Sequence, residues 1–269
     1  MKIATVVIVT KPHQPEVARL ASELAAWFEA KKIHASLDPA SAQRADLCVV
    51  VGGDGTLLAA ARLMGERQVP ILAINYGGLG FLTEVTRDEM YPAMEGVLAG
   101  KIVINTRMMM DVGVYRDTTL VETYHALNDA VIHKGTLARI IELEAWVDGL
   151  YVSKFRSDGL ILSTPTGSTA YNISAGGPIV YPMMWAIIMT PISSHTLTNR
   201  PLVLPAESRV EITLQSVSDE VYVTVDGQVG KRLESGDRVT VRKSQRLVQL
   251  ITPAGKGFFD VLRDKLKWG

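Results

Sequence analysis

The stretch Val49-Val50-Val51-Gly52-Gly53-Asp54-Gly55-Thr56 joins an apolar run to the start of a helix through three glycines. Residues 47–51 are continuously apolar, which is typical of a strand buried on both faces of a parallel sheet. Apolar residues then recur at the spacing of one helix face over residues 57–64. Glycines let backbone N–H groups approach a ligand, and a helix N-terminus carries partial positive charge. The stretch therefore predicts a phosphate-binding turn between a strand and a helix.

Asp54 is the unusual member of this turn, because a carboxylate repels a bound phosphate. It becomes useful if it takes a proton from an attacking hydroxyl or is linked to a metal ion. A phosphate-binding turn with its own carboxylate therefore suggests phosphoryl transfer. The alternative is a plain strand–helix turn that is capped by Asp54 or Thr56.

The composition indicates a globular protein without a strong electrostatic field. Its 269 residues are enough for one large domain or two medium ones, and 47% of them are hydrophobic. Lys+Arg and Asp+Glu both number 28, so net charge attracts neither nucleic acid nor an anionic membrane. The longest apolar stretch, residues 183–192, is far short of the ~20 residues of a membrane span. The single cysteine, Cys48, is expected to be a buried structural thiol. We expect a cytoplasmic protein with no nucleic-acid or membrane partner.

The order of the expected elements predicts an α/β domain followed by a β-rich domain. Strands and helices alternate in the first hundred residues, which is typical of a doubly wound parallel sheet. Strands are expected at 3–9, 33–37, 47–51 and 70–74, and helices at 15–30, 56–64 and 88–100. In such sheets ligands bind at the carboxyl ends of the strands, so the glycine-rich segments at Gly52 and Gly77 should face one crevice.

From Lys101 onward apolar residues alternate with a period of two, which predicts a β-rich half. Asp148-Gly149 and Asp226-Gly227 have the composition of hairpin turns. Residues 258–268 again have a helical pattern. We therefore expect a first domain at 1–100, joined by a C-terminal helix within 255–269, and a second domain at 101–254.

Three stretches of the β-rich half are polar or glycine-rich, and the third, Val225-Asp226-Gly227-Gln228, is best explained by itself as a hairpin turn. Asn128-Asp129 breaks an apolar strand, either to hydrogen-bond a ribose or base or to form a β-bulge. Five hydroxyl side chains lie between Ser163 and Thr169, around Gly167, as in a loop that wraps a polar ligand. The residue after Gly167 is a serine rather than a lysine, so the loop is not a Walker A loop. Tyr171 offers a flat face to a nucleobase.

Two other chemistries are disfavoured. The five histidines show no metal-ligand spacing, which argues against a zinc site. No serine lies in a Gly-x-Ser-x-Gly elbow, which argues against the common serine hydrolases.

Four segments, in this order, resemble the NAD kinases of the bacterial type. They are Gly52-Gly53-Asp54-Gly55-Thr56, Gly78-Leu79-Gly80-Phe81-Leu82, Asn128-Asp129, and a run from Asp158-Gly159 through Thr164-Pro165-Thr166-Gly167-Ser168-Thr169-Ala170-Tyr171 to Gly176-Gly177-Pro178. The first segment is shared with phosphofructokinases and with lipid kinases of the diacylglycerol and sphingosine types. The last segment is specific to the NAD kinases, and the resemblance covers nearly the whole chain.

The resemblance implies transfer of the terminal phosphoryl group of ATP or polyphosphate to the 2′-hydroxyl of the adenosine ribose of NAD or NADH. It implies Mg²⁺ or another divalent metal as cofactor, and a homodimer or homotetramer. The implied fold is a Rossmann- or phosphofructokinase-like α/β domain for the phosphate donor, followed by a β-sandwich-like domain for NAD.

The resemblance also assigns roles to single residues. Asp54 is the catalytic residue, as a general base or through an indirect metal contact. The phosphate donor would be bound by Gly52, Gly53, Gly55 and Thr56. The NAD pocket would be formed by Asp54, Gly55, Phe81, Asn128, Asp129, Arg139, Arg156, Asp158, Thr166, Thr169, Ala170, Tyr171, Asn172, Ile173, Ser174, Asp226 and Gln228.

One position departs from the family pattern. The family's amide–carboxylate pair is usually Asn-Glu, and Asp129 is one methylene shorter, which reduces its reach by ~1.5 Å.

Two other functions remain as alternatives. A lipid kinase would share the glycine turn, but it would need a membrane-binding surface or helix, and the sequence shows neither. A nucleotide-sensing protein without catalysis would need no residue such as Asp54.

Overall fold

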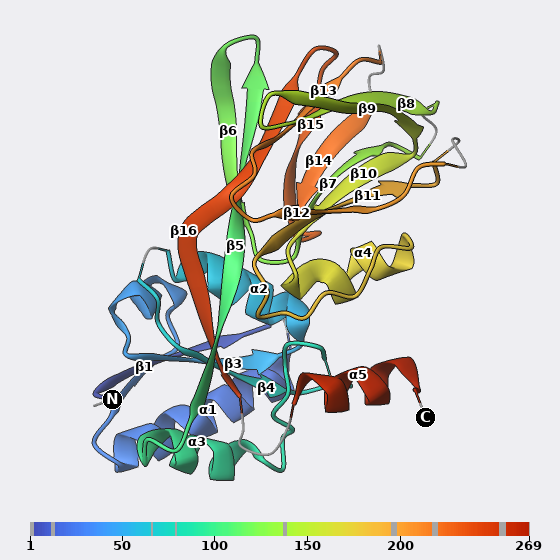
Figure 1. Cartoon of the computed structure of the whole chain (residues 1–269). Coiled ribbons are helices and arrows are strands. Elements are labelled where there is room, and N and C mark those ends of the chain that lie inside the picture. The colour runs from blue at the N-terminus through green and yellow to red at the C-terminus, as the bar shows by residue number, and fades with distance from the viewer. Residues whose placement is uncertain are drawn as a thin grey trace. The chain divides into compact units, whose positions relative to one another are not determined.

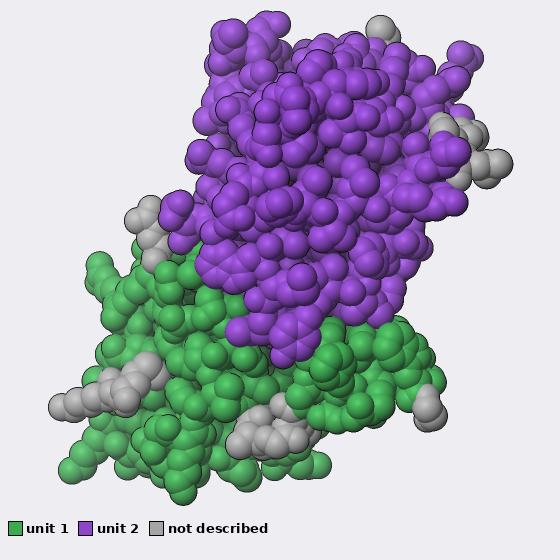
Figure 2. All heavy atoms as spheres, in the orientation of Figure 1, with its two compact units in different colours: residues 1–106, 246–269 green, residues 107–245 purple. Residues whose placement is uncertain are grey.

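The chain forms two compact units, seen in a computed structural model that describes residues 3–11, 14–65, 67–78, 80–136, 139–194, 198–216, 220–252 and 257–268. Unit 1 comprises residues 1–106 and 246–269, and unit 2 comprises residues 107–245 (Figure 2). Residues 246–254 thus belong with the N-terminal part, because the end of the last strand pairs with a strand of unit 1. Leu79, part of the second segment quoted above, lies outside the described residues.

Unit 1 alternates strands and helices along the chain, as the sequence predicts. The described elements are β1 (Thr5–Thr10), α1 (Pro15–Ala30), β2 (His34–Ser36), the 3₁₀ helix η1 (Pro39–Arg44), β3 (Leu47–Gly52), α2 (Asp54–Leu63), β4 (Ile71–Asn75), α3 (Met90–Leu98) and α5 (Phe258–Leu266). Helix α1 has the predicted bounds, whereas α2 begins at Asp54, two residues before the predicted start.

The strands of unit 1 form a parallel sheet with helices on both faces. The order is β2-β1-β3-β4, and the end of β16 (Arg238–Thr252) lies beside β4, also in parallel. Every residue of β3 is buried, as its continuous apolar run predicts. Side chains of α1 and α3 pack with one face of the strands, and α2 packs against β3 and β1 from the other side (Figure 1). This arrangement confirms the doubly wound sheet.

Unit 2 is almost entirely β structure. Its elements are β6 (Thr119–Ala126), β7 (Asp129–Lys134), β8 (Ile141–Val147), β9 (Leu150–Ser157), β10 (Gly159–Ser163), the 3₁₀ helix η2 (Thr166–Thr169), α4 (Tyr171–Ser174), β11 (Ala186–Ile192), β12 (Leu202–Pro205), β13 (Val210–Leu214), β14 (Val221–Val225) and β15 (Val229–Leu233). The long strands β5 (Val103–Arg116) and β16 begin in one unit and end in the other.

One antiparallel sheet of unit 2 has the order β12-β11-β10-β7-β14-β15. A second group of strands runs β16-β13-β8-β9, with β5 beside β16 and β6 beside β5. Alternate residues of both groups form one apolar core, as in a β-sandwich. Asp148-Gly149 and Asp226-Gly227 have positive φ angles, as hairpin turns of the predicted kind require.

The surroundings of the cysteine agree with the expectation from the sequence. Cys48 is fully buried, and burial raises the pKa of its thiol to about 12, as expected for an unreactive structural cysteine. None of the helices in the described part of the chain is long and apolar enough to cross a membrane.

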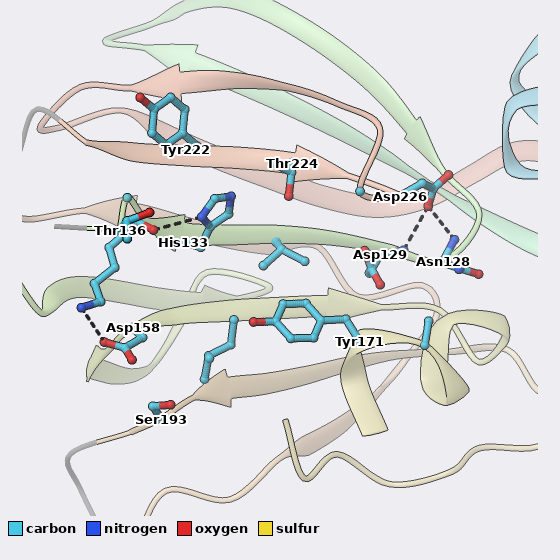
Figure 3. Close-up of a pocket in the computed structure, with 16 residues that line it drawn as sticks. Asn128, Asp129, His133, Thr136, Asp158, Tyr171, Ser193, Tyr222, Thr224 and Asp226 are labelled. Carbon is cyan, nitrogen blue, oxygen red and sulfur yellow. Dashed lines mark hydrogen bonds and ion pairs between the residues drawn. The ribbon is translucent and has the colours of Figure 1, made fainter. Parts of the chain in front are cut away.

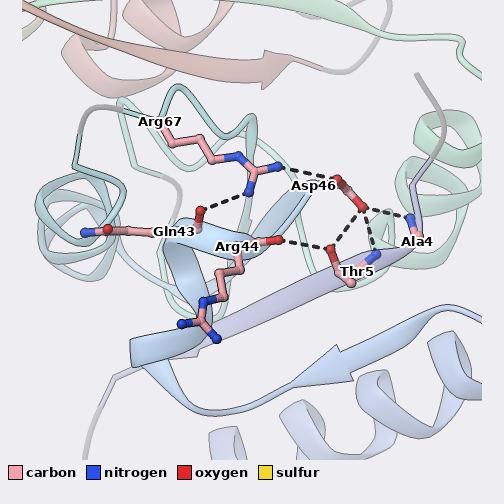
Figure 4. Close-up of polar contacts among 6 residues, drawn as sticks. All are labelled: Ala4, Thr5, Gln43, Arg44, Asp46 and Arg67. Carbon is pink, nitrogen blue, oxygen red and sulfur yellow. Dashed lines mark hydrogen bonds and ion pairs between the residues drawn. The ribbon is translucent and has the colours of Figure 1, made fainter.

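A carboxylate joins the amino ends of β1 and β3 (Figure 4). Asp46 Oδ2 accepts hydrogen bonds from the backbone N–H groups of Ala4 and Thr5 and from the Thr5 hydroxyl, each at 3.0 Å. Arg67 lies 3.7 Å from Asp46 Oδ1 and donates to the Gln43 carbonyl. The N–H of Ala4, then that of Thr5, the Thr5 hydroxyl and the charge of Arg67 lower the pKa of Asp46, against the opposing effect of burial.

Asp46→Asn should therefore lower the free energy of unfolding at neutral pH by about 1–3 kcal/mol, the usual value for hydrogen bonds to a charged group. Because the pKa of Asp46 is lower in the folded chain, its stabilisation is present above the unfolded pKa of about 3.9 and is lost as pH falls through the folded value. Urea unfolding at several pH values measures this.

The exposed turn residue Asp117 provides the control, because Asp117→Asn should leave stability unchanged at every pH. A difference between wild type and Asp46→Asn that stayed constant from pH 7 to pH 3 would contradict the role given to the Asp46 charge.

Candidate functional site

The turn after β3 places Asp54 at the first position of α2. Gly53 is the N-cap, with φ −111° and ψ −172°, an extended conformation that any residue can adopt. A Cβ on Gly52 would lie 2.3 Å from Thr56 Oγ1, so Gly52 is required for the packing of the turn itself. Gly53 is different, because a Cβ there would meet no atom of the described residues within 4 Å. The protein's own packing does not explain the glycine at position 53.

The Asp54 carboxylate binds the loop that follows β4. Its Oδ2 accepts the backbone N–H of Phe81 at 2.9 Å, and its Oδ1 accepts those of Leu82 at 3.2 Å and Thr83 at 3.1 Å. The Thr83 hydroxyl lies 3.0 Å from the same Oδ1. We call these four hydrogen bonds the Asp54 clamp. They join the two glycine-rich segments that the sequence analysis singled out.

Gly80 is glycine because of this clamp. A Cβ at position 80 would lie 2.0 Å from Asp54 Oδ1 and 2.4 Å from Thr83 Oγ1. Both distances are too short for a non-bonded contact, so no side chain fits there. The second glycine-rich segment is therefore explained in part by the carboxylate of the first segment. Phe81, expected in the NAD pocket, has Lys265 of α5 over its ring, 5.9 Å from the centroid.

Asn75 and Thr83 also belong to this network, and the sequence analysis missed both. The Asn75 Oδ1 accepts the N–H of Gly77 at 2.7 Å, and its Nδ2 donates to the Gly78 carbonyl at 3.0 Å. The same Nδ2 donates to Thr83 Oγ1 at 2.7 Å. Both Asn75 and Thr83 are buried. The only available signal was an amide that ends an apolar strand just before glycines.

Unit 1 contains a pocket of about 750 Å³ next to these loops. Gly52 and Gly53 line it together with Gly77 and Gly78, which confirms that the two glycine-rich segments face one crevice. A Cβ at position 78 would also meet nothing within 4 Å. The remaining lining residues are Lys11, Gln14, Pro15, Glu16, Val17, Asn75 and Tyr76.

Unit 2 contains a larger pocket, of about 940 Å³, at the ends and along one face of the six-stranded sheet. Tyr171 extends into it from α4 and is 47% exposed. Figure 3 shows its ring between His133 and Thr224 on one side and Asp158 and Ser193 on the other. The lining residues are Asn128, Asp129, Val131, His133, Lys134, Gly135, Thr136, Asp158, Ala170, Tyr171, Ile192, Ser193, Tyr222, Thr224, Asp226 and Gly227.

Asp226 fixes the backbone at one end of this pocket (Figure 3). Its carboxylate accepts the N–H groups of Leu127 at 3.1 Å, Asn128 at 2.7 Å and Asp129 at 3.2 Å. Its own N–H donates to the Asp129 carbonyl at 2.9 Å. Asp226 thus holds the Asn128-Asp129 segment in place from the hairpin turn of β14 and β15.

Two buried polar atoms in this region have no hydrogen-bond partner among the described residues: Asn128 Oδ1 and Thr166 Oγ1. The segments that carry them are packed tightly, because a Cβ on Gly167 would lie 2.1 Å from the Asn128 carbonyl. A buried polar atom without a partner costs roughly 1–3 kcal/mol. Such atoms are consistent with a site whose ligand completes the hydrogen bonds.

Asp129 is also buried, and it lies close to a second carboxylate. Burial first, and then the negative charge of Asp226, raise the pKa of Asp129 to about 7. Below that pH the side chain is a neutral acid that can donate a hydrogen bond as well as accept one.

The structure places other expected NAD-binding residues elsewhere. Asn172 is buried within the loop, where it donates to the carbonyls of Ser168 and Pro178 at 3.0 Å and accepts the Thr190 hydroxyl at 2.6 Å. Arg156 lies 3.4 Å from Glu142 on the neighbouring strand. The other expected NAD-binding residues that do not line this pocket are Asp54, Gly55 and Phe81 of unit 1, and Arg139, Thr166, Thr169, Ile173, Ser174 and Gln228.

Several pocket residues were not predicted from the sequence, among them three on the neighbouring strands β7 and β14. The rings of His133 on β7 and Tyr222 on β14 are stacked, with their centroids 6.0 Å apart. Lys134 pairs with Asp158, one of the expected residues, at 3.2 Å (Figure 3). Residues 133 and 222 are direct partners in the β7–β14 register. Nothing in the linear sequence gives that register.

A metal site built by the protein alone does not fit the residues present. The described part of the chain brings no three His, Cys, Asp or Glu side chains together as metal ligands. The Asp54 carboxylate, the expected indirect metal contact, already accepts four hydrogen bonds.

Two family models match the chain. The ATP-NAD kinase N-terminal domain matches residues 29–102, and the ATP-NAD kinase C-terminal domain matches residues 127–252. The first match contains the Asp54 clamp, and the second contains most of the pocket of unit 2.

Known proteins are similar over nearly the full length. The NAD kinase of Trichlorobacter lovleyi is 49% identical and that of Geotalea daltonii is 46% identical, each over 98% of both chains. A crystal structure of yeast NADH kinase complexed with NADH has a TM-score of 0.91 at 26% identity, over 100% of this chain and 88% of that one. An NAD kinase from Archaeoglobus fulgidus in complex with ATP has a TM-score of 0.79 at 25% identity, over 98% of both chains. The chain therefore belongs to the ATP-NAD kinase family.

Proposed function

We propose that the chain transfers the terminal phosphoryl group of ATP to the 2′-hydroxyl of the adenosine ribose of NAD, giving NADP. The observation that carries the proposal is the pocket of unit 2, with an exposed aromatic ring and a buried amide oxygen that has no hydrogen-bond partner among the described residues. The relatives are named NAD kinases, and the solved neighbours hold NADH or ATP. Membership of this family favours the proposal over a lipid kinase.

The pocket of unit 2 suits an adenosine. Asn128 Oδ1 needs a hydrogen-bond donor, and the exocyclic amino group of adenine is one. Tyr171 supplies a face on which the base can stack. Asp129, neutral below about pH 7, can donate to a ribose oxygen, and Asp226 holds the backbone of Asp129 in place.

The pocket of unit 1 suits a phosphate donor. Gly53 and Gly78 line it at positions where a side chain would have met open space, so a ligand in close contact with the backbone explains them. The N-terminus of α2 begins beside them and favours negative charge. Lys11 adds a positive charge to the lining.

A divalent metal, Mg²⁺ first of all, would enter this reaction with the donor, bound to its phosphates. It would neutralise negative charge on the transferred group. The surroundings hold few lysines, so they supply only part of the positive charge that this needs. Asp54 is the candidate base for the acceptor hydroxyl, as the family resemblance implies. Replacing NAD by NADH, or ATP by polyphosphate, in the assay described next tests whether the chain accepts these substrates. Its place of action would be the cytoplasm.

The assay uses purified protein with Mg-ATP and NAD, and a dehydrogenase that requires NADP detects the product. Wild type should form NADP, and Asp54→Asn should reduce turnover by about 10²-fold or more, since an amide cannot accept the proton. The side-chain amide of this variant would also place its N–H groups against the N–H and hydroxyl donors of the clamp. The melting temperature of the variant should therefore fall as well. NAD binding, followed by calorimetry, should persist.

The exposed helix residue Asp264 gives the control, because Asp264→Asn should retain both activity and melting temperature. A wild-type protein that forms no NADP above background would sink the proposed function. Wild-type turnover in Asp54→Asn would remove Asp54 from the chemistry.

We also propose that the chain forms a homodimer or homotetramer through β12. Within the described residues this strand has one neighbour, β11, and so it is an edge of the six-stranded sheet. Leu202 and Val203 on it are 37% and 52% exposed, and the nearby Met184 and Trp185 are exposed too. An apolar edge strand is a ready surface for pairing with a second copy.

Val203→Lys should shift the protein toward the monomer in light scattering, because the charge would be buried in the paired edge. Val229, 38% exposed on the opposite edge strand β15, is the matched position, and Val229→Lys should leave the assembly unchanged. An unchanged assembly in Val203→Lys, or a monomeric wild type, would contradict the proposal.

A further inference from the structure

The hydrogen bonds around Asp54 divide its two carboxylate oxygens unequally. Oδ1 accepts three donors: the N–H groups of Leu82 and Thr83 and the Thr83 hydroxyl. Oδ2 accepts the N–H of Phe81. A carboxylate oxygen has two lone pairs, so the acceptor capacity that is left lies on Oδ2.

We propose that Thr83 and Asn75 are positioning residues that hold Oδ1 and leave Oδ2 as the atom that takes the proton from the acceptor hydroxyl. This inference rests on the proposed function, and it assigns the chemistry to one atom. As the O–P bond to the 2′-oxygen forms, the hydroxyl proton moves to Oδ2. The bond between the transferred phosphorus and the bridging oxygen breaks, and its electron pair leaves with that oxygen on ADP.

The orientation of the Asn75 amide follows from its backbone partners. The N–H of Gly77 can only donate, so the atom 2.7 Å from it must be the amide oxygen. The Gly78 carbonyl can only accept, so the atom 3.0 Å from it must be the amide nitrogen. With the amide fixed in this way, the nitrogen also donates to Thr83 Oγ1, at 2.7 Å.

The direction of the Thr83 hydroxyl follows in turn. Its oxygen accepts from Asn75, and its one proton remains for the Asp54 Oδ1 at 3.0 Å. The result is a chain of hydrogen bonds that runs from Asn75 through Thr83 to Asp54. Both positioning residues are buried, which strengthens these hydrogen bonds because water does not compete with them.

This chain of hydrogen bonds has a chemical consequence for the carboxylate. Donors to Oδ1 prevent the carboxylate from rotating, so that Oδ2 keeps its place. Loss of one donor should therefore reduce turnover without removing any contact to NAD.

Thr83→Val tests this, because it replaces the hydroxyl by a methyl group of similar size. We expect kcat to fall by about 10–100-fold, the usual effect of one hydrogen bond to a charged group. The KM for NAD should change less than about 2-fold, as for an interaction that acts only in the transition state.

Thr83→Ser keeps the hydroxyl, so it should restore most of the turnover. Thr83→Ala removes the hydroxyl without placing a new apolar group beside the carboxylate, and it serves if the valine variant does not fold. Thr213→Val is the matched control on β13 of unit 2, and it should behave as wild type.

The possible outcomes separate this inference from the proposed function. A wild type that forms no NADP defeats the proposed function itself. An active wild type, together with folded Thr83→Val and Thr83→Ala variants of unchanged kcat, overturns the inference alone. A loss of kcat that Thr83→Ser does not restore also overturns it, because packing rather than the hydroxyl would then be the cause.

Discussion

The Asp54 clamp is the interaction on which the site of unit 1 depends. One carboxylate at the first position of α2 binds three successive N–H groups of the loop after β4, and the Thr83 hydroxyl as well. The clamp explains why position 80 must be glycine, because a Cβ there would occupy the space of the carboxylate. The same hydrogen bonds that fold the loop also fix the orientation of the proposed base. Folding and chemistry therefore depend on one side chain.

Unit 2 shows a different relation between stability and function. Asn128 Oδ1 and Thr166 Oγ1 are buried without a hydrogen-bond partner in the part of the chain that the structure describes, and Asp129 is buried close to Asp226. Each of these features opposes folding, since burial is unfavourable for unpaired polar atoms and for like charges. The Asp226 hydrogen bonds and the large apolar core of the β-sandwich offset this. A bound nucleotide that completes the hydrogen bonds would recover the stability lost here.

The sequence was sufficient for the features that depend on local spacing. The continuous apolar run predicted the buried strand β3, and the helical spacing over residues 57–64 predicted the buried face of α2. Features that depend on contacts between distant segments could not be predicted in this way. Neither Asn75 nor Thr83 carries a periodic signal, and the pairing of His133 with Tyr222 depends on strand register. Asn172 lies in a segment rich in ligand-binding residue types, yet its contacts show that it holds the loop together.

The most direct measurement of the central claim is hydrogen exchange at the amides of Phe81, Leu82 and Thr83 in the ligand-free protein. These three amides lie outside helices and strands, so the clamp is the reason for any protection they have. We predict that they are protected in wild type, and that Asp54→Ala makes them exchange at least about 10-fold faster, while amides of β3 are unchanged. Unprotected amides in wild type, or equal protection in Asp54→Ala, would contradict the account.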